Sequence, residues 1–367
     1  MADDDAAEAR EAGPAAAIRA EIAAVGPIRF DRFMELALYG PGGYYERPPV
    51  GAEGDFVTSP HVHPVFGELL ARGLRELWTL LDRPDPFRVS EIGAGDGTLA
   101  RQLLEHLSDL PLRYRAIERS EGARAQLAEI PGLEVAGEIG EDPHVVLGHE
   151  LLDNLPFRLV QGDAEILVDV DGERLVRTRV PLDDGLADLT RDRASDDELA
   201  VPTGALDLIG DLAGIIRNGY ALFVDYGDEA GPGGPVHGYR DHRVVEDVLA
   251  HPGAADITAG VDFGLLGEAA RAAGLQVFAG VTQFRALLAL GFEEWMHAEL
   301  ADQGALLNDG QGIEAVRRWA GRSRASILVA PDQLGRLRWF GLAKPGLPRP
   351  SFLADEEKSR FDSDSTR

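Results

Sequence analysis

Residues 89–99 of the chain are Val89-Ser90-Glu91-Ile92-Gly93-Ala94-Gly95-Asp96-Gly97-Thr98-Leu99. An apolar run ends here in an acid, three glycines follow, and a segment of helical pattern begins. Glycines at such a point let the backbone approach a ligand closely, and the amides at the N-terminus of the next helix face that ligand. The stretch therefore predicts a strand, a turn and a helix, with a ligand site at the turn.

The spacing of the three glycines is G-x-G-x-G, whereas dinucleotide-binding folds use G-x-G-x-x-G. Thr98 stands where the third glycine of that second pattern would be. Glu91, two residues before the first glycine, suits S-adenosylmethionine, because the acid or its neighbouring carbonyls can neutralise the ammonium group of that molecule. The alternative is a glycine-rich turn that holds no ligand.

Glu118 ends the next apolar run, about 20 residues after the glycines. A carboxylate at that point can accept hydrogen bonds from both hydroxyls of a ribose. Together with the glycine turn, Glu118 favours a nucleoside-binding half.

Short apolar runs alternate with helical patterns after Pro84, which is typical of βαβ units around a parallel sheet in an α/β protein. We expect strands at 87–92, 113–118, 133–136, 145–148, 221–225 and 276–281, and helices at 99–107, 122–130, 203–216 and 263–273. Residues 164–180 instead alternate with period two around Asp171-Gly172, which predicts an antiparallel hairpin inserted between the fourth and fifth strands.

The domain boundaries follow from these patterns. We expect residues 83–160 and 203–343 to form the core, and residues 161–202 to form the insertion with the hairpin. Residues 15–82 are expected to be a helical segment that covers the core. Residues 1–14 and the tail at 344–367 are expected to be disordered, because neither has an apolar period.

Two acids, Glu150 and Asp153, follow the fourth predicted strand. Residues at the carboxyl ends of strands in open α/β sheets face the ligand crevice, so two carboxylates there could clamp a cationic guanidinium nucleophile. The alternative is a helix-capping Asp beside a solvated Glu. Residues 149–153 also mimic the metalloprotease pattern H-E-x-x-H, but position 153 is Asp, and we expect no metal.

Composition excludes several classes of protein. The 63 acidic and 36 basic residues give a formal net charge of −27, which disfavours nucleic-acid binding. Two explanations of this charge are genome composition and salt adaptation, and we favour genome composition. The chain contains no cysteine, so disulfides and thiolate metal sites are excluded.

With no apolar run long enough for a membrane span and no secretory pattern at the N-terminus, we expect a cytoplasmic protein. The oligomeric state is left open.

An ordered set of motifs resembles the MidA-like methyltransferases. Besides the glycine turn and Glu118, the set comprises Pro27-Ile28 and residues 54–60, 66–68, 150–156, 224–227, 237–242, 256–258 and 261–263. The resemblance covers roughly residues 20–340 and implies a class I S-adenosylmethionine-dependent methyltransferase, with a Rossmann-like, seven-stranded, mostly parallel sheet.

The MidA-like family includes mitochondrial proteins that assist the assembly of respiratory complex I, and its activity is methylation of a protein arginine. The resemblance therefore implies a partner protein as substrate, for which a respiratory-complex subunit is a candidate. It places the cofactor on Gly93, Gly95, Gly97 and Glu118, under a loop with Asp55 and Thr58, and it places Glu150 and Asp153 beside the acceptor as the catalytic residues.

Two positions depart from the family pattern. His149 stands where Asn is common, and His61 follows Pro60 where Glu is usual. Three other functions remain as alternatives: methylation of a small molecule or another nucleophile, a non-catalytic assembly factor that binds S-adenosylmethionine, and a nicotinamide-dependent dehydrogenase, against which Thr98 argues.

Overall fold

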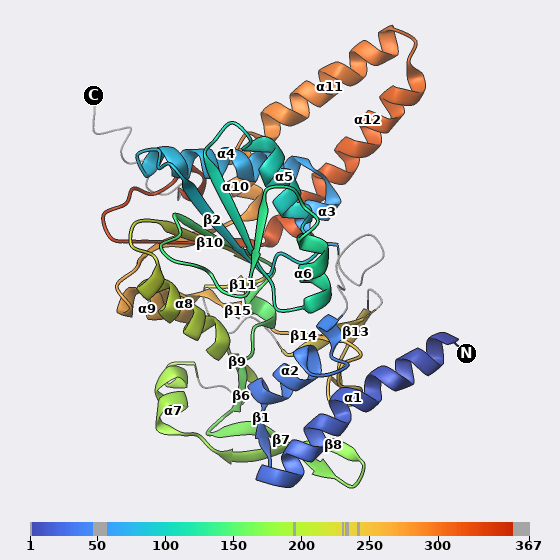
Figure 1. Cartoon of the computed structure of the whole chain (residues 1–367), viewed down its shortest axis with the longest axis vertical. Coiled ribbons are helices and arrows are strands. Elements are labelled where there is room, and N and C mark those ends of the chain that lie inside the picture. Colours follow the sequence, from blue (N-terminus) through green and yellow to red (C-terminus); the bar gives the residue numbers. More distant parts are fainter. Residues whose placement is uncertain are drawn as a thin grey trace.

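The structure, a computed structural model, describes residues 2–46, 57–193, 196–229, 231, 235–240 and 243–354. Its centre is a seven-stranded sheet in the order β16-β17-β10-β5-β2-β3-β4 (Figure 1). The strands are β2 (Phe87–Ile92), β3 (Leu112–Ile117), β4 (Leu133–Ala136), β5 (Val145–His149), β10 (Tyr220–Asp225), β16 (Gln276–Thr282) and β17 (Arg338–Ala343). β17 runs antiparallel to the other strands of this sheet. The expected seven-stranded, mostly parallel sheet is confirmed.

Strand β17 was not among the strands expected from the sequence. It contains Gly341, and glycine weakens the pattern by which a strand is recognised. The position has a packing reason, because a Cβ atom at Gly341 would lie 2.4 Å from Cδ1 of Leu353. Leu353 belongs to the C-terminal segment that follows the strand, so no pattern within the strand itself records this contact.

Helices cover both faces of the central sheet. On one face lie α4 (Val65–Leu80), α5 (Thr98–His106) and α10 (Gln283–Ala289), and on the other lie α8 (Thr203–Ile215) and α9 (Phe263–Ala272). Within β10, Leu222 and Val224 join the first hydrophobic cluster, while Ala221 and Phe223 join the second. Because successive side chains of a strand point to opposite faces, this strand reads as a continuous apolar run. Helix α6 (Glu121–Leu127) precedes β4 at the sheet edge.

A second, antiparallel sheet contains the expected hairpin. Strands β7 (Ala164–Asp171) and β8 (Arg174–Pro181) pair around a turn in which Gly172 has φ +61°, and β6 (Arg158–Gln161), β9 (Leu199–Val201) and β1 (Ile28–Arg29) complete the sheet. Helix α7 (Asp184–Thr190) connects β8 to β9, and α1 (Ala2–Val25) and α2 (Phe30–Tyr39) lie beside the sheet in the lower part of Figure 1. Phe30 of α2 stacks on Phe157, with ring centroids 5.5 Å apart. Ile18 and Ile22 of α1 share a hydrophobic cluster with Ile166 and Val168 of β7, so the N-terminal helices pack against the insertion.

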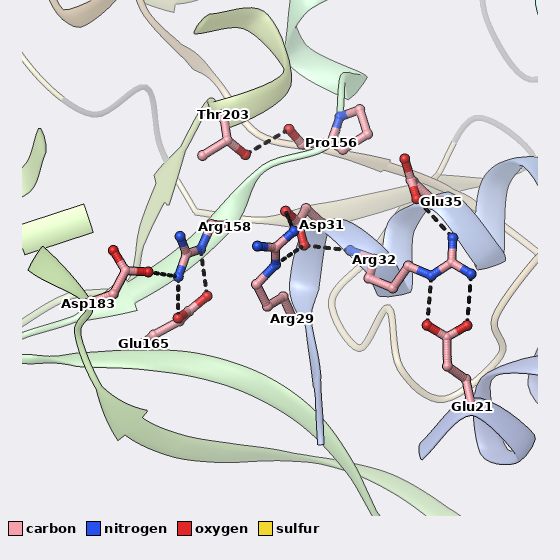
Figure 2. Close-up of polar contacts among 10 residues, drawn as sticks. All are labelled: Glu21, Arg29, Asp31, Arg32, Glu35, Pro156, Arg158, Glu165, Asp183 and Thr203. Atoms are coloured by element: carbon pink, nitrogen blue, oxygen red, sulfur yellow. Dashed lines mark hydrogen bonds and ion pairs between the residues drawn. The ribbon is translucent and has the colours of Figure 1, made fainter. Parts of the chain in front are cut away.

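Charged pairs reinforce this second unit (Figure 2). Arg158 of β6 makes two hydrogen bonds to Glu165 of β7, at 2.7 and 2.5 Å, and a third to Asp183 at 2.6 Å. Arg32 of α2 makes two hydrogen bonds to Glu21 of α1, at 2.7 and 2.8 Å. Such bidentate pairs fix orientation as well as distance, so they hold α1 to α2 and β6 to β7.

The two ends of the chain differ from expectation. Residues 2–14 belong to helix α1, although we expected residues 1–14 to be disordered. Five of these residues are alanine, the strongest helix former, and two are glutamate, so the stretch favours helix even without an apolar period. At the other end, residues 344–354 pack on the core: Phe352 is buried against Trp339, with ring centroids 5.9 Å apart. Residues 355–367 lie outside the described residues.

A pair of helices projects from the body at the upper right of Figure 1. Helices α11 (Phe292–Asn308) and α12 (Gly312–Ala325) form an antiparallel hairpin, which we call the arm. Among the residues that the structure describes, no helix is both long enough and apolar enough to cross a membrane.

Candidate functional site

The glycine turn has the predicted form. It connects β2 to α5, and Gly93, Gly95 and Gly97 have φ values of +70°, +56° and +78°. This left-handed region is strained for other residues. At Gly97 a Cβ atom would also lie 2.4 Å from Cδ1 of Ile130. The turn therefore needs glycine both for its backbone shape and for its close packing.

Glu118 lies directly beside the turn. Its Oε2 accepts a hydrogen bond from the backbone N–H of Gly95 at 3.1 Å. Its Oε1 accepts hydrogen bonds from the N–H groups of Arg119, at 2.7 Å, and Ser120, at 3.0 Å. These bonds hold the carboxylate at the end of β3, next to the glycine backbone, where a ribose could reach it.

One cavity brings the glycine turn, Glu118 and Glu150 together. Its lining residues are Tyr39, Tyr45, Gly93, Gly95, Glu118, Ser120, Ala123, Glu150, Leu151 and Asn154. It lies at the carboxyl ends of β2, β3 and β5, where ligands bind in open α/β sheets. Glycines for close approach, a fixed carboxylate and aromatic walls fit a nucleoside with a charged tail. The residues present therefore fit S-adenosylmethionine.

The two tyrosines of this cavity were not singled out by the sequence reasoning. Tyr45 donates a hydrogen bond to Oδ1 of Asp256 at 2.8 Å and accepts one from Nδ2 of Asn154 at 2.7 Å. Its ring stacks on Tyr39 with centroids 5.2 Å apart. For Tyr45 the signal in the sequence was the share of aromatic residues in the segment that follows α2, whereas Tyr39 is the last residue of α2 itself.

Glu91 is directed elsewhere. Its side chain is buried, and its Oε2 accepts a hydrogen bond from the hydroxyl of Tyr114 at 2.7 Å. Burial raises the pKa of Glu91 to about 8. The residue does not line the cavity described above, and a role in neutralising the cofactor ammonium stays a prediction.

A network of backbone hydrogen bonds holds the loop that carries the two acids. Glu150 has φ +48° and donates its N–H to the carbonyl of Val224 at 2.7 Å. The buried carboxylate of Asp225 accepts hydrogen bonds from the N–H groups of Leu151, at 2.9 Å, and Leu152, at 2.6 Å. Asp225 therefore positions the loop after β5 from the neighbouring strand β10.

The Glu150 side chain is mostly buried, with 15% of its surface exposed, and its Oε1 is fully buried and unpaired within the described part of the chain. Its Oε1 has no hydrogen-bond partner among the described residues, and the closest charged-pair contact is Nδ1 of His149 at 3.6 Å. Burial, with the nearby Asp153, raises the pKa of Glu150 to about 8. Burial lowers the pKa of His149 to about 3, so this imidazole is neutral and does not compensate the acid.

Asp153 takes a different position. Its Oδ2 accepts a hydrogen bond from the hydroxyl of Thr258 at 2.8 Å, and burial raises its pKa. Thr258 belongs to β14 (Asp256–Thr258). Glu150 thus lines the cavity, while Asp153 is bonded to the segment behind it, so the two acids do not present matching carboxylates to the cavity.

A short helix, α3 (Ser59–Val62), lies against the glycine turn. His61 connects them: its Nδ1 is 2.9 Å from the hydroxyl of Thr58, and its Nε2 is 3.0 Å from Oδ2 of Asp96. Thr58 is therefore placed near the turn, as a covering residue would be. Asp55 lies outside the described residues. Within the described residues, no group of three or more potential ligands could hold a metal ion.

The fold and site together define a class of protein. A seven-stranded sheet with an antiparallel seventh strand, a glycine turn after the first strand and an acid after the second are the features of a class I methyltransferase. The chain belongs to the family described as S-adenosyl-L-methionine-dependent methyltransferase, whose model matches residues 69–281. The resemblance to MidA-like methyltransferases is confirmed, as are the enzyme class and the cofactor.

Individual relatives agree with this assignment. The chain is 32% identical over 318 residues to the Drosophila melanogaster "Protein arginine methyltransferase NDUFAF7 homolog, mitochondrial", covering 73% of this chain and 72% of that protein. It is 27% identical over 374 residues to the Xenopus laevis protein of that name, covering 88% and 82%. A Burkholderia thailandensis structure with bound S-adenosyl-homocysteine has a TM-score of 0.80 and 27% identity, covering 95% of this chain and 96% of that one.

One expectation is wrong. We expected a cytoplasmic protein, but the animal relatives are named mitochondrial, which contradicts that localisation. The expectation depended on the absence of a secretory pattern, and such an absence does not distinguish among the compartments inside a cell.

Proposed function

We propose that this methyltransferase acts on an arginine side chain of a partner protein, and that Glu150 receives the guanidinium. The names of the animal relatives support the type of acceptor. The observation that carries the proposal is the buried Oε1 of Glu150, which has no hydrogen-bond partner among the described residues. A buried carboxylate oxygen of this kind is costly unless a donor meets it, and a guanidinium supplies several donors in a planar fork.

The proposed reaction requires little covalent chemistry from the chain. S-adenosylmethionine, when bound, supplies a methyl group that its sulfonium makes electrophilic. A guanidinium nitrogen forms the new N–C bond as the S–C bond breaks, and that nitrogen releases one proton. Glu150 lies in the same cavity as Gly93 and Glu118, so it can orient the nitrogen along the line of transfer.

Glu150 is also the proposed acceptor of the released proton. Because its pKa in the free enzyme is about 8, its ionised carboxylate, which predominates above that pH, is a base strong enough to take up the proton. Asp153, bonded to Thr258, would position the loop and add negative potential behind Glu150. Glu118 and the glycine turn would hold the nucleoside part of the cofactor, under Thr58 of the covering segment.

We further propose a respiratory-complex subunit as the partner, on the resemblance to complex I assembly proteins. The strongly acidic chain, with a net charge of −27, would attract a basic segment of such a protein.

The test uses S-adenosylmethionine labelled with tritium in the methyl group and two matched peptide libraries, one with a fixed central arginine and one with lysine in its place. We expect label in methylarginine after hydrolysis of the first library alone. Equal labelling of both libraries, or label found only in small molecules of a cell extract, would contradict the proposal.

A further inference from the structure

A stack of three side chains lies along the cofactor cavity beside Glu118. The guanidinium carbon of Arg119, the residue after Glu118, is 4.2 Å from the centre of the Tyr39 ring. Tyr39 in turn stacks on Tyr45, with ring centroids 5.2 Å apart and ring planes 21° from parallel. Both tyrosines line the cavity. A cofactor that fills this cavity therefore packs against the stack, and its contacts restrict the motion of both rings.

The hydroxyl of Tyr45 connects the stack to residues 150–154, which we call the acceptor loop. The hydroxyl accepts a hydrogen bond from Nδ2 of Asn154 at 2.7 Å and donates one to Oδ1 of Asp256 at 2.8 Å. Burial and the neighbouring Asp256 raise the pKa of Tyr45 well above its usual range, so the hydroxyl keeps the proton that it donates. The hydroxyl thus bridges the acceptor loop and β14.

Strand β14 holds the acceptor loop at a second point. The hydroxyl of Thr258 donates a hydrogen bond to Oδ2 of Asp153 at 2.8 Å, and the N–H of Ala259 donates one to the backbone carbonyl of Asp153 at 3.0 Å. Helix α2 and β14 pack within one hydrophobic cluster and lie side by side in Figure 1. Tyr45, β14 and the acceptor loop therefore form a closed set of contacts, in which a shift of one member moves the others.

We propose that Tyr45 couples the binding of the two substrates. A cofactor in the cavity fixes the ring of Tyr45, and the hydroxyl then fixes the acceptor loop in the form that presents Glu150 to the acceptor. This inference rests on the proposed role of Glu150 and adds that the cofactor strengthens acceptor binding. Because the ring lines the cofactor cavity and the hydroxyl holds the loop, removal of the hydroxyl alone separates cofactor binding from its effect on the loop.

Hydrogen exchange with S-adenosylhomocysteine as the only ligand tests the coupling. The probe is the amide of Ala259, which bonds the carbonyl of Asp153 and is not among the described residues that line the cavity. We expect saturating S-adenosylhomocysteine to slow the exchange of this amide at least about fivefold in the wild type, and less than about twofold in Tyr45→Phe. The variant keeps the ring, so calorimetry should give an affinity for S-adenosylhomocysteine within about threefold of the wild type.

Tyr44→Phe is the matched control. Tyr44 packs edge-on against the ring of Tyr45, with centroids 5.1 Å apart, and is not among the described residues that line the cavity. This variant should keep the slowing seen in the wild type. Asn154→Ala removes the bond to Tyr45 from the loop side and should lose it. The coupling is wrong if the ligand leaves the Ala259 amide of the wild type unchanged, or if either folded variant that lacks the bond keeps the full slowing.

Kinetics with the arginine peptide library separates this inference from the proposed function. In Tyr45→Phe we expect the apparent KM for the peptides to rise at least about fivefold, while the KM for S-adenosylmethionine stays within about twofold. A merely structural defect would raise both values together, and that result would overturn the coupling. If the wild type labels no arginine, the proposed acceptor is wrong, whereas arginine labelling with an unchanged peptide KM in Tyr45→Phe overturns the coupling alone.

Discussion

Glu150 combines a strained backbone with a carboxylate whose buried Oε1 is unpaired among the described residues. Its φ of +48° lies in the left-handed region, which costs about 1–3 kcal/mol for a residue other than glycine. The bond from its N–H to Val224 and the neighbouring carboxylate of Asp225 hold it there. Strain that surrounding bonds maintain in this way is common at functional sites, and it supports a catalytic role for this residue rather than for Asp153.

The first prediction concerns Glu150→Gln. We expect turnover to fall at least about 100-fold, because the neutral amide neither pairs with the guanidinium nor accepts its proton. Affinity for S-adenosylmethionine, measured by calorimetry, should change less than about threefold, because the residues proposed to hold the nucleoside are intact. Glu129→Gln, at an exposed acid, is the matched control. Loss of cofactor binding in Glu150→Gln would show that the residue belongs to the cofactor site.

The second prediction concerns pH. Since the pKa of Glu150 is about 8, an acceptor guanidinium meets a protonated acid below that pH. We expect kcat/KM to rise about tenfold per pH unit up to about pH 8 and then to level off. The slope should be absent in Glu150→Gln. A pH-independent profile in the wild type would contradict this assignment.

The same raised pKa has a consequence for stability. The folded protein holds this proton more tightly than the unfolded chain, in which the pKa is near 4.5. The contribution of Glu150 to the free energy of unfolding is therefore greatest below that value and decreases as pH rises to about 8. Urea unfolding of the wild type and of Glu150→Gln should diverge over this range, with the variant more stable at the alkaline end.

At the scale of elements, the glycine turn is tested by Gly97→Ala. The new Cβ would combine a φ of +78° with contacts of 2.4 Å to Ile130 and 2.8 Å to Leu127. We expect the free energy of unfolding to fall by about 2–4 kcal/mol. Gly132→Ala is the control, because its φ is +81° with nothing within 4 Å, so it measures backbone strain alone. Equal losses in the two variants would show that packing at Gly97 is unimportant.

The contacts of α3 are an element-scale feature that joins the site to the arm. The ring of His63, directly after α3, lies 5.1 Å from that of Trp295 in α11. Ser59 of α3 shares a hydrogen bond with Gln283, which also bonds the carbonyl of Leu328 beyond α12. The segment next to the glycine turn therefore rests on the base of the arm.

At the scale of the whole molecule, charge is the dominant property. A net charge of −27 destabilises the compact state by self-repulsion, and salt screens that repulsion. We expect the melting temperature to rise by several degrees as NaCl increases from about 0.05 to 1 M. Sucrose of equal osmolality controls for effects other than screening. A melting temperature that falls with salt would show that the attractive pairs, such as Arg158 with Glu165, outweigh the repulsion.

The sequence by itself determined the features that depend on neighbouring residues. Apolar runs predicted six strands of the central sheet, the glycine spacing predicted the turn and its ligand class, and the order of motifs predicted the family. These properties are readable because backbone preference and periodicity act over a few residues. β17 was missed because glycine interrupts its pattern, and residues 2–14 were misjudged because their helix depends on propensity and has no apolar period.

Only the tertiary structure decided which of the predicted site residues share a cavity. It places Glu150 beside Gly93 and Glu118 but directs Asp153 to Thr258 and Glu91 to Tyr114. It also brings in Tyr45, which lies more than a hundred residues from its partner Asn154. The physical reason is that a side chain's partner is chosen by packing and hydrogen bonding between segments distant in the chain, and no local pattern records that choice.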